Sequence, residues 1–312
     1  MQKEILEYYD AFKNNAEVKL PELRIQYRDY AAWQLEQTKS SEQESHKAFW
    51  METLSGDLPL INLPSQNPRP EVKTYKGINL QTFISASSTR GLKDYCQTHE
   101  GSLFMGLLTC FYGLLHRYTG QEDFILGAPV AGRNHSELEN QIGVYINTLA
   151  LRNQVNSSDS FDALFKRVKE TSLSAFEHQD YSFDSLVDNL NLKRDVSRSA
   201  VFDVMFMLHN VGDQVVEFTL PEDGDIEILD HGAKISKFDL EVSFNELGKY
   251  LSFDITYNKD VYQDSMIRRL MQHFKQLIAA FIEQPKQSID QIKYLSTKEE
   301  KELLTGFNFQ HV

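Results

Sequence analysis

The chain has 312 residues, and 45 Asp and Glu against 32 Lys and Arg give it a formal net charge of −13. With 41% hydrophobic and 12% aromatic residues, the composition is that of a folded protein with a sizeable core, which excludes disordered and collagen-like chains. Because nucleic-acid affinity depends on concentrated positive charge, the acidic balance and the lack of a Lys and Arg cluster argue against a DNA or RNA partner.

In the first part of the chain, two helices precede an extended loop whose four prolines favour open backbone. Alternating apolar and polar residues then predict a strand from Gly77. The longest apolar run, 103–115, predicts a buried core helix; its 13 residues are fewer than the roughly 17 that a membrane span needs. Up to residue 190, we expect helices at 2–13, 27–54, 88–99, 102–118, 160–177 and 182–190, and strands at 77–84, 124–129 and 144–155. The helix ending near 99 would be capped by Ser87 or Ser88.

In the second part, the clearest feature is a hairpin. Apolar and polar residues alternate over 238–245 and over 251–258, and the connection contains Gly248. The tail resembles a linker with a short helix, for which Thr297 and Glu300 form a capping box. Further strands are expected at 202–208, 215–220 and 226–229, and a long helix at 263–282. This mixed order with a late antiparallel meander predicts an α/β sandwich with a mixed sheet.

Most catalytic sequence signatures are absent. There is no GxGxxG, GxxxxGK[ST], GxSxG or HExxH motif, so dinucleotide, P-loop, α/β-hydrolase and zinc-protease interpretations lose support. Cys96 and Cys110 are the only cysteines, they form no CxxC pair, and the nine His residues are scattered, so we expect no metal site. Two buried thiols and the lack of a secretion signal favour a reducing, cytoplasmic location without membrane insertion.

Three polar stretches interrupt the periodic pattern. The first, 127–147, carries Arg133 between Gly-containing turns and is either an exposed loop with a solvated Arg or part of a site. The second, 178–183, joins two helices, and a capped turn with aromatic packing is its favoured interpretation. The third, 194–198, precedes an apolar strand and is either a solvated turn or a set of charges near a buried site.

Taken together, these stretches resemble the motifs of the condensation domains of nonribosomal peptide synthetases. The similar segments are YRDYAAWQ (27–34), RYTGQEDFILGAPVAGR (117–133), IGVYINTLALR (142–152), HQDYSFDSLVDNL (178–190) and RDVSRSAVFDVMFMLHN (194–210). KFDLEVSF and YLSTKEEKELLTGFN resemble the family's last strand region and its linker toward an adenylation domain. The resemblance implies a V-shaped pair of lobes, each like chloramphenicol acetyltransferase. It also implies amide formation between two thioesters, both delivered on the 4′-phosphopantetheine arms of partner carrier domains, with no cofactor bound directly.

One part of the family pattern is missing. The family's catalytic motif is His-His-x-x-x-Asp-Gly, whereas this sequence contains no adjacent His pair. We therefore expect a truncated condensation domain that is inactive alone, because an amine attacking a thioester gains from a positioned base or dipole. The expected parts are the last helix of the N-terminal lobe (1–20), an interlobe helix and proline-containing connector (21–76), the complete C-terminal lobe (77–285) and a linker toward an adenylation domain (286–312). The missing N-terminal lobe would be a partner.

The resemblance assigns roles to few residues. Arg133 matches the Arg that pairs with the Asp of the missing motif, and we expect it to lack that partner. Tyr145 lies in the segment that resembles the floor of the reaction tunnel, and Asn147 and Asn210 match polar positions near it.

Arg194 and Arg198 are expected to hold local geometry, with contact to a phosphopantetheine phosphate as the alternative. Other functions also stay open. A noncatalytic docking module would bind a carrier domain or pack against an adenylation domain through its acidic surface and tail. An epimerisation-type homologue shares the fold and the His motif but differs around the floor segment, where IGVYINTLALR is similar to the condensation version. A heterocyclisation domain would differ mainly in the missing motif.

Overall fold

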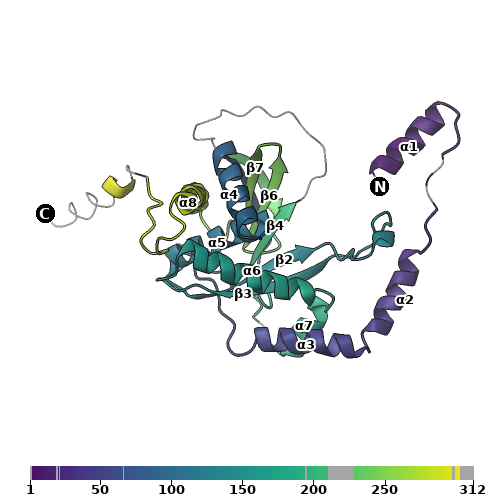
Figure 1. Cartoon of the computed structure of the whole chain (residues 1–312), viewed down its shortest axis with the longest axis horizontal. Helices are drawn as coiled ribbons and strands as arrows, with labels where there is room; N and C mark the ends of the chain where they lie inside the picture. Colours follow the sequence, from purple (N-terminus) through teal and green to yellow (C-terminus); the bar gives the residue numbers. More distant parts are fainter. Residues whose placement is uncertain are drawn as a thin grey trace.

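A computed structural model describes residues 2–18, 20, 22–65, 67–193, 195–209, 228–296 and 299–302. At its centre lies a seven-stranded sheet with the order β3-β2-β4-β6-β7-β1-β5 (Figure 1). Strand β4 runs parallel to β2 and β6, and the other neighbouring pairs are antiparallel. The strands are β1 (Lys76–Ile84), β2 (Asp123–Val130), β3 (Asn147–Gln154), β4 (Val204–His209), β5 (Leu229–Ile235), β6 (Leu240–Leu247) and β7 (Tyr250–Asn258). The predicted mixed sheet and the late hairpin are confirmed.

Four helices cover one face of this sheet (Figure 1). They are α4 (Ala86–Thr98), α5 (Leu103–Thr119), α6 (Phe161–Glu177) and α8 (Asp264–Glu283). Every residue of α5 from Met105 to His116 is buried, and Phe111 contacts the rings of Phe206 on β4 and Phe274 on α8. This helix is the predicted core helix, and its burial of apolar surface anchors the two layers to each other. Among the described helices, none is long and apolar enough to cross a membrane.

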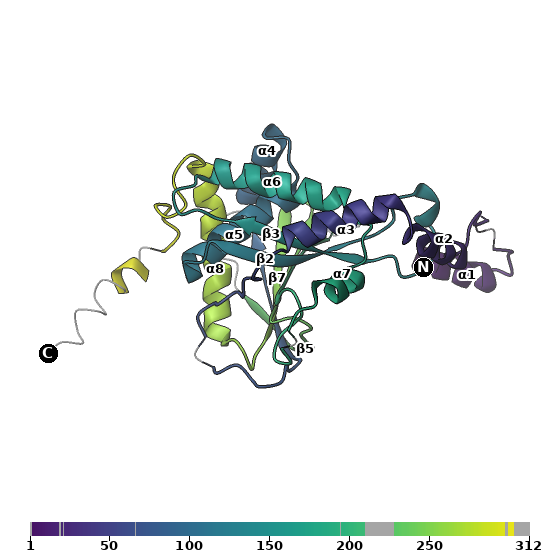
Figure 2. The same cartoon turned by 90° about the horizontal axis from the view of Figure 1, so that it is seen from below.

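The N-terminal helices extend away from this body (Figure 2). Helices α1 (Gln2–Lys13) and α2 (Tyr27–Gln37) lie beyond the end of the sheet, whereas α3 (Ser41–Thr53) returns to it, with Trp50 buried. The single helix predicted over 27–54 is therefore wrong. Residues 38–40 break it, because the Ser40 hydroxyl accepts a hydrogen bond from the Gln43 N–H and starts a new helix.

Arg152 on β3 joins the end of α3 to the sheet. Its guanidinium donates hydrogen bonds to the carbonyls of Thr53, Ser55 and Asp57, and it pairs with the Asp123 carboxylate at 2.7 Å. Because a guanidinium offers five donors in one plane, one side chain satisfies several orphan carbonyls at the helix end. Arg152 thus fixes the C-terminal end of α3 relative to β2 and β3. Helices α2 and α3 together are called the α2–α3 arm below.

Two strand predictions differ from the structure. The strand predicted over 144–155 begins only at Asn147, because residues 142–146 form a loop that packs across Tyr27 of α2. The strand predicted at 226–229 shares only Leu229 with β5, which runs to Ile235 over residues for which no strand was predicted. Residues 226–227 and the strand predicted at 215–220 lie outside the described residues.

The observed helix caps involve other serines than the predicted residues. Ser85, rather than Ser87 or Ser88, caps α4 by accepting a hydrogen bond from the Ser88 N–H. In the tail, Ser296 and Glu299 exchange reciprocal hydrogen bonds, whereas Thr297 of the predicted pair lies outside the described residues. In both cases a serine closer to the chain entry satisfies the first free amides. Both cysteines are buried as expected.

Candidate functional site

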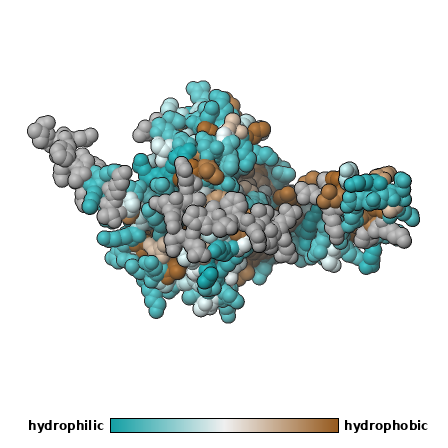
Figure 3. Space-filling view, turned by 90° about the horizontal axis from the view of Figure 1, so that it is seen from above, coloured by the Kyte–Doolittle hydropathy of each residue, from teal (hydrophilic) through white to brown (hydrophobic). Residues whose placement is uncertain are grey.

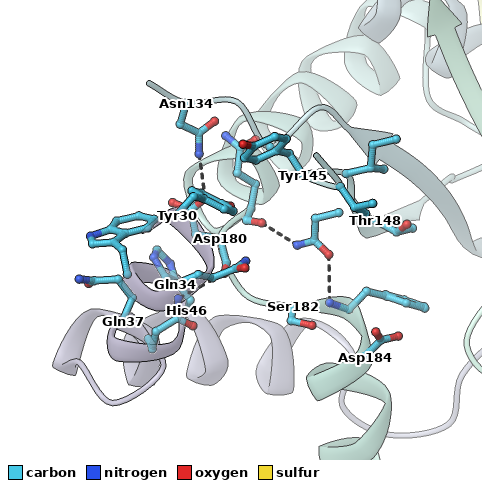
Figure 4. Close-up of a pocket in the computed structure, with 18 of the residues that line it drawn as sticks. Tyr30, Gln34, Gln37, His46, Asn134, Tyr145, Thr148, Asp180, Ser182 and Asp184 are labelled. Carbon is cyan, nitrogen blue, oxygen red and sulfur yellow. Dashed lines mark hydrogen bonds between the residues drawn. The ribbon is translucent and has the colours of Figure 1, made fainter. Parts of the chain in front are cut away.

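A cavity of about 640 Å³ opens between the α2–α3 arm and the end of the sheet where β2 stops and β3 starts. Four of the five motif-like segments contribute to its wall, and helix α7 (Phe183–Leu190) closes one side (Figure 4). The lining residues are Tyr30, Trp33, Gln34, Gln37, Ser40, Glu42, Gln43, His46, Gly132, Asn134, His135, Val144, Tyr145, Ile146, Asn147, Thr148, Gln179, Asp180, Ser182, Phe183 and Asp184. Segments distant in sequence therefore form one site.

Two glycines allow the loops of this site to approach closely. Gly132, just after β2, has φ +63°, and a Cβ there would lie 1.9 Å from the Tyr145 carbonyl oxygen. A Cβ on Gly143 would lie 2.3 Å from the Tyr27 ring. Only glycine fits where backbone meets backbone or ring at such distances. The two glycines thus permit the contact between the end of β2, the loop before β3 and α2.

Tyr145 is the buried centre of an aromatic group at the cavity. Its ring centroid lies 5.3 Å from Tyr27 in an edge-to-face arrangement and 4.7 Å from Tyr30. Its hydroxyl donates to Gln141 Oε1 at 2.6 Å, and the Gln141 amide donates to the Ile25 carbonyl at 2.8 Å. Aromatic pairs and a satisfied hydroxyl make this group rigid. Tyr145 therefore docks the start of α2 onto the loop before β3.

Arg133 lies over the Tyr145 ring. Its guanidinium carbon is 4.2 Å from the ring centroid, and the guanidinium donates a hydrogen bond to the Leu138 carbonyl. Stacking of this kind suits the planar, weakly hydrated guanidinium. Within the part of the chain that the structure describes, Arg133 makes no ion pair. Its charge is therefore satisfied by a ring and a carbonyl rather than by a carboxylate.

Asn147, the first residue of β3, holds the turn that follows α6. Its Nδ2 donates to the carbonyls of Gln179 and Tyr181, both at 2.7 Å, and its Oδ1 accepts from the Phe183 N–H at 3.0 Å. An amide offers both donors and an acceptor, so one side chain satisfies three backbone groups of an irregular turn. The turn 179–183 forms the part of the cavity wall next to α3, where Gln43 donates a hydrogen bond to the Asp180 carbonyl.

Asp180 of this turn and Tyr30 of α2 both line the cavity (Figure 4), and although both belong to motif-like segments, the sequence assigned neither of them a role. Asp180 Oδ1 accepts a hydrogen bond from Asn134 Nδ2 at 2.8 Å, and Gln43 Nε2 donates to the Asp180 carbonyl at 3.2 Å. Burial, and then the nearby Asp180 carboxylate, raise the pKa of Tyr30. Tyr30 is therefore a neutral hydroxyl beside a carboxylate.

His46 is a further lining residue that sequence reasoning missed. It lies on α3 one turn before Trp50, is only 9% exposed, and contacts the His178 ring edge-to-face at 5.1 Å. Its Nδ1 is buried without a hydrogen-bond partner. The sequence could not identify His46 as a cavity residue. A single His on one face of a predicted helix indicates only that the position faces the core.

Arg198 is not at the cavity but in a separate cluster of buried charges. It pairs with Asp203 at 2.6 Å, and both side chains are largely buried, at 15% and 5% exposure. Beside this pair, Arg69 of the connector pairs with Asp239, whose pKa is raised by burial despite that contact. Lys73 donates to the Ser199 hydroxyl. The cluster ties the connector to the segment before β4 and to the start of β6.

The remaining predicted site residues, Arg194 and Asn210, lie outside the described residues. Among residues that the structure does describe, no group of three or more His, Cys, Asp or Glu side chains is arranged to hold a metal ion. The site is thus built from amides, aromatic rings and a few carboxylates.

The model of the family described as "Condensation domain" matches residues 1–304. The chain belongs to the condensation domain family.

Curated relatives agree with this assignment. Surfactin synthase subunit 1 of Bacillus subtilis (strain 168) is 38% identical over 291 residues, which cover 93% of this chain and 8% of the relative. Tyrocidine synthase 3 of Brevibacillus parabrevis is 37% identical over 297 residues, which cover 94% of this chain and 4% of the relative. The chain therefore spans less than a tenth of the length of either synthase.

Solved structures show the same fold. The X-domain from teicoplanin biosynthesis matches with a TM-score of 0.78 at 19% identity, over 93% of this chain and 66% of that one. The first condensation domain of the CDA synthetase matches with a TM-score of 0.71 at 19% identity, over 93% of this chain and 62% of that one.

Proposed function

We propose that this chain is the C-terminal part of a condensation domain that forms amide bonds between carrier-bound aminoacyl or peptidyl thioesters. The amine of the acceptor attacks the thioester carbonyl of the donor, a C–N bond forms, the C–S bond breaks, and the donor carrier's thiol leaves with the proton. The observation that carries the proposal is the convergence of four motif-like segments on one cavity. The chain's role is to supply one wall of the reaction tunnel.

The chemistry of the cavity fits the pantetheine part of a carrier arm. Pantetheine has two amide groups, and the amides of Gln34, Gln37, Gln43 and Asn134 line the cavity with donors and acceptors (Figure 4). A phosphate is a poorer match, because no Lys or Arg belongs to the described lining residues. The pantetheine chain would therefore enter the cavity while its phosphate stays outside with the carrier domain.

The base for amine attack must come from elsewhere in the assembly. The 312 residues contain no adjacent His pair, and Arg133, which matches the family's Arg beside that motif, rests on Tyr145. We infer that the chain alone forms no amide bond and requires an N-terminal lobe with the His-His-x-x-x-Asp-Gly motif. General-base assistance typically contributes about 10²–10⁴-fold to such a step.

The test restores that lobe. Dipeptide formation is measured on loaded carrier proteins with this chain alone, with an upstream segment carrying the motif fused to it, and with the second His of that motif replaced by Ala. We expect product only from the fused protein with the intact motif. Amide formation by the chain alone, or equal rates with and without the second His, would contradict the proposal.

A noncatalytic docking role is the second candidate, and one observation favours it. The tail segment, residues 286–296 and 299–302, packs on the lobe: Ile289 and Ile292 are buried, and Asp290 contacts His116 at 3.2 Å. Such an ordered tail would present a defined surface to an adenylation domain. A fused protein that folds and binds carrier domains but makes no dipeptide would favour docking. Isomerisation of a carrier-bound aminoacyl group instead of dipeptide formation would indicate an epimerisation-type homologue.

A further inference from the structure

The buried charge cluster around the connector holds one cation more than it has carboxylates to pair with. Arg69 pairs with the buried Asp239 carboxylate. Arg198 pairs with Asp203 at 2.6 Å, so each carboxylate already has a guanidinium partner. Lys73 is the third cation, and within the described part of the chain it makes no ion pair. Because buried charges are costly unless they are paired, a third cation beside two matched pairs gains little from staying charged.

The Lys73 amine is held in a fixed position that is partly shielded from water. Its Nζ donates to the Ser199 hydroxyl at 2.5 Å and lies 5.4 Å and 5.9 Å from the ring centroids of Phe238 and Tyr75. The Lys73 backbone N–H donates to the Val196 carbonyl at 2.9 Å, which fixes the start of the side chain. The rings attract an ammonium group, but they also take the place of water that would hydrate it. The amine is therefore half-buried at the surface of the molecule, next to the exposed Tyr75.

These surroundings lower the pKa of Lys73. Burial is the largest cause, and the nearby Arg69 guanidinium acts in the same direction. The carboxylates of Asp203, Asp239 and Glu241 oppose the shift but do not cancel it. A lysine that is desolvated beside another cationic group is an activated nucleophile, because more of its amine is unprotonated at neutral pH. Exposed lysines, in contrast, are almost fully protonated there.

We propose that Lys73 is a modification site at which acyl thioesters acylate the chain. The unprotonated Nζ attacks the thioester carbonyl carbon, a C–N bond forms, the C–S bond breaks, and the thiol leaves with the proton that Nζ gives up. The acylated lysine carries no charge, so the cluster is left with two guanidinium groups and two carboxylates. The product is a modification of the chain itself and not an amide between two carrier-bound substrates. The inference goes beyond the proposed function, because the reaction needs an acyl thioester but no carrier domain.

The test treats the full chain with S-acetyl-N-acetylcysteamine, a small acyl thioester, and follows acetylation of each lysine by peptide mass spectrometry. The matched control is Lys39, which is exposed between α2 and α3. We expect Lys73 to be acetylated at least about threefold faster than Lys39 at neutral pH. This ratio should fall as the pH rises, because exposed lysines then lose their protons as well. Equal rates for the two lysines at neutral pH, or a ratio that does not change with pH, would overturn the inference.

Variants of Ser199 test whether the missing ion-pair partner makes Lys73 reactive. Ser199→Asp places a carboxylate beside Nζ, so acetylation of Lys73 should fall to the rate of Lys39. Ser199→Asn is the neutral control of nearly the same size and should keep most of the preference. An undiminished preference in Ser199→Asp would overturn the inference. Circular dichroism confirms that each variant is folded, and if Ser199→Asp does not fold, the pH dependence of the ratio in the unchanged chain decides.

The inference and the proposed function can fail independently. Dipeptide formation by the fused protein reports on the proposed function, whereas acetylation of Lys73 is measured on the chain alone. A fused protein that makes dipeptide while Lys73 reacts no faster than Lys39 would overturn only the inference. A chain with a reactive Lys73 whose fused form makes no dipeptide would overturn only the proposed function.

Discussion

Asn147, at the start of β3, receives a backbone hydrogen bond from Phe183, at the start of α7: the Phe183 N–H lies 3.0 Å from Asn147 Oδ1. The two residues are 36 positions apart, so this bond fixes a long-range relationship between the sheet edge and the helix that closes the cavity. Together with the hydrogen bonds to the Gln179 and Tyr181 carbonyls, this bond lets the Asn147 side chain hold the 179–183 turn in place at the cavity.

Replacement of Asn147 by Ala should therefore destabilise the protein. Three hydrogen bonds at about 1 kcal/mol each, and backbone groups left without partners, predict a loss of about 3 kcal/mol in the free energy of unfolding. Urea unfolding measures it. The control is Asn14→Ala, because exposed Asn14 makes a single side-chain bond to the Asp10 carbonyl. Similar losses for both variants would show that the turn does not depend on Asn147.

Gly132→Ala should be far more damaging than Gly248→Ala. Both residues have positive φ, +63° and +59°, which costs an alanine about 1–2 kcal/mol. At Gly248 a Cβ meets nothing within 4 Å, whereas at Gly132 it would meet the Tyr145 carbonyl. We expect a loss of about 1 kcal/mol for Gly248→Ala and more than about 3 kcal/mol for Gly132→Ala, measured by thermal unfolding. Equal losses would mean that the loop at Gly132 moves away without cost.

Arg198→Met tests the buried charge cluster. Removing the guanidinium leaves the Asp203 carboxylate, 5% exposed, without its ion-pair partner. Breaking a buried pair on one side costs about 3–5 kcal/mol, whereas a surface pair contributes at most about 1 kcal/mol. The matched control is Arg24→Met, since the Arg24 and Glu137 side chains are 85% and 42% exposed. An effect of Arg198→Met as small as that of the control would contradict a structural role.

Acid should loosen the tail segment. Burial alone would raise the pKa of Glu299, but hydrogen bonds from Ser296 and His273 outweigh it and lower the pKa to about 2. Burial also lowers the pKa of His273, which lies 2.9 Å from Glu299 and 2.6 Å from the Tyr118 hydroxyl. Nearby Arg269 opposes protonation of His273, and the Tyr294 ring packs on it.

Both shifts act in the same direction. Ionised Glu299 stabilises the folded tail above its ordinary pKa of 4.5, and this contribution disappears as the pH falls toward about 2. Neutral His273 likewise favours the fold above 6.5, and its contribution is lost as the pH falls through its lowered pKa. Hydrogen exchange of the tail should therefore accelerate on acidification. Glu299→Gln should weaken this pH dependence and exposed Glu283→Gln should not; the reverse result would contradict the assignment.

The exposed apolar surface around the cavity should make the chain self-associate. Ile142, Val144 and Ile146 are 61%, 77% and 69% exposed on alternate positions of one loop, and Figure 3 shows brown apolar patches on the N-terminal arm as well. Exposed apolar side chains gathered in one loop are typical of interaction surfaces and favour association. Light scattering should show oligomers that disappear when all three residues are replaced by Thr. The control, Val72→Thr at a single exposed site in the connector, should leave association unchanged.

The sequence was sufficient for the class of fold because its signals were periodic. The buried α5 and the hairpin of β6 and β7 follow directly from apolar runs and alternation. The ends of helices and strands that depend on tertiary contacts could not be predicted from these periodic patterns. The break at residues 38–40 depends on the hydrogen bond that the Ser40 hydroxyl accepts from the Gln43 N–H. The loop over 142–146 has the apolar residues of a strand, but it packs across Tyr27 instead of pairing in the sheet.

The site shows the same division. Arg133, Tyr145 and Asn147 could be singled out because they belong to motif-like segments, but their partners could not. Asp180 also belongs to a motif-like segment, but its position beside the cavity, like that of His46, follows from the packing of α3 against the 179–183 turn, which no local sequence pattern predicts.

The packing of the tail has a practical consequence for where this chain can be joined to another protein. A junction placed directly after α8, at Pro285, would strip Ile289 and Ile292 from the lobe and expose the apolar surface that they cover. It would also remove the Ser288 hydroxyl that donates to the Ser157 carbonyl at 2.7 Å. A junction placed beyond residue 302 keeps these contacts. The lobe in the fusion protein would then retain the tail that covers its apolar surface.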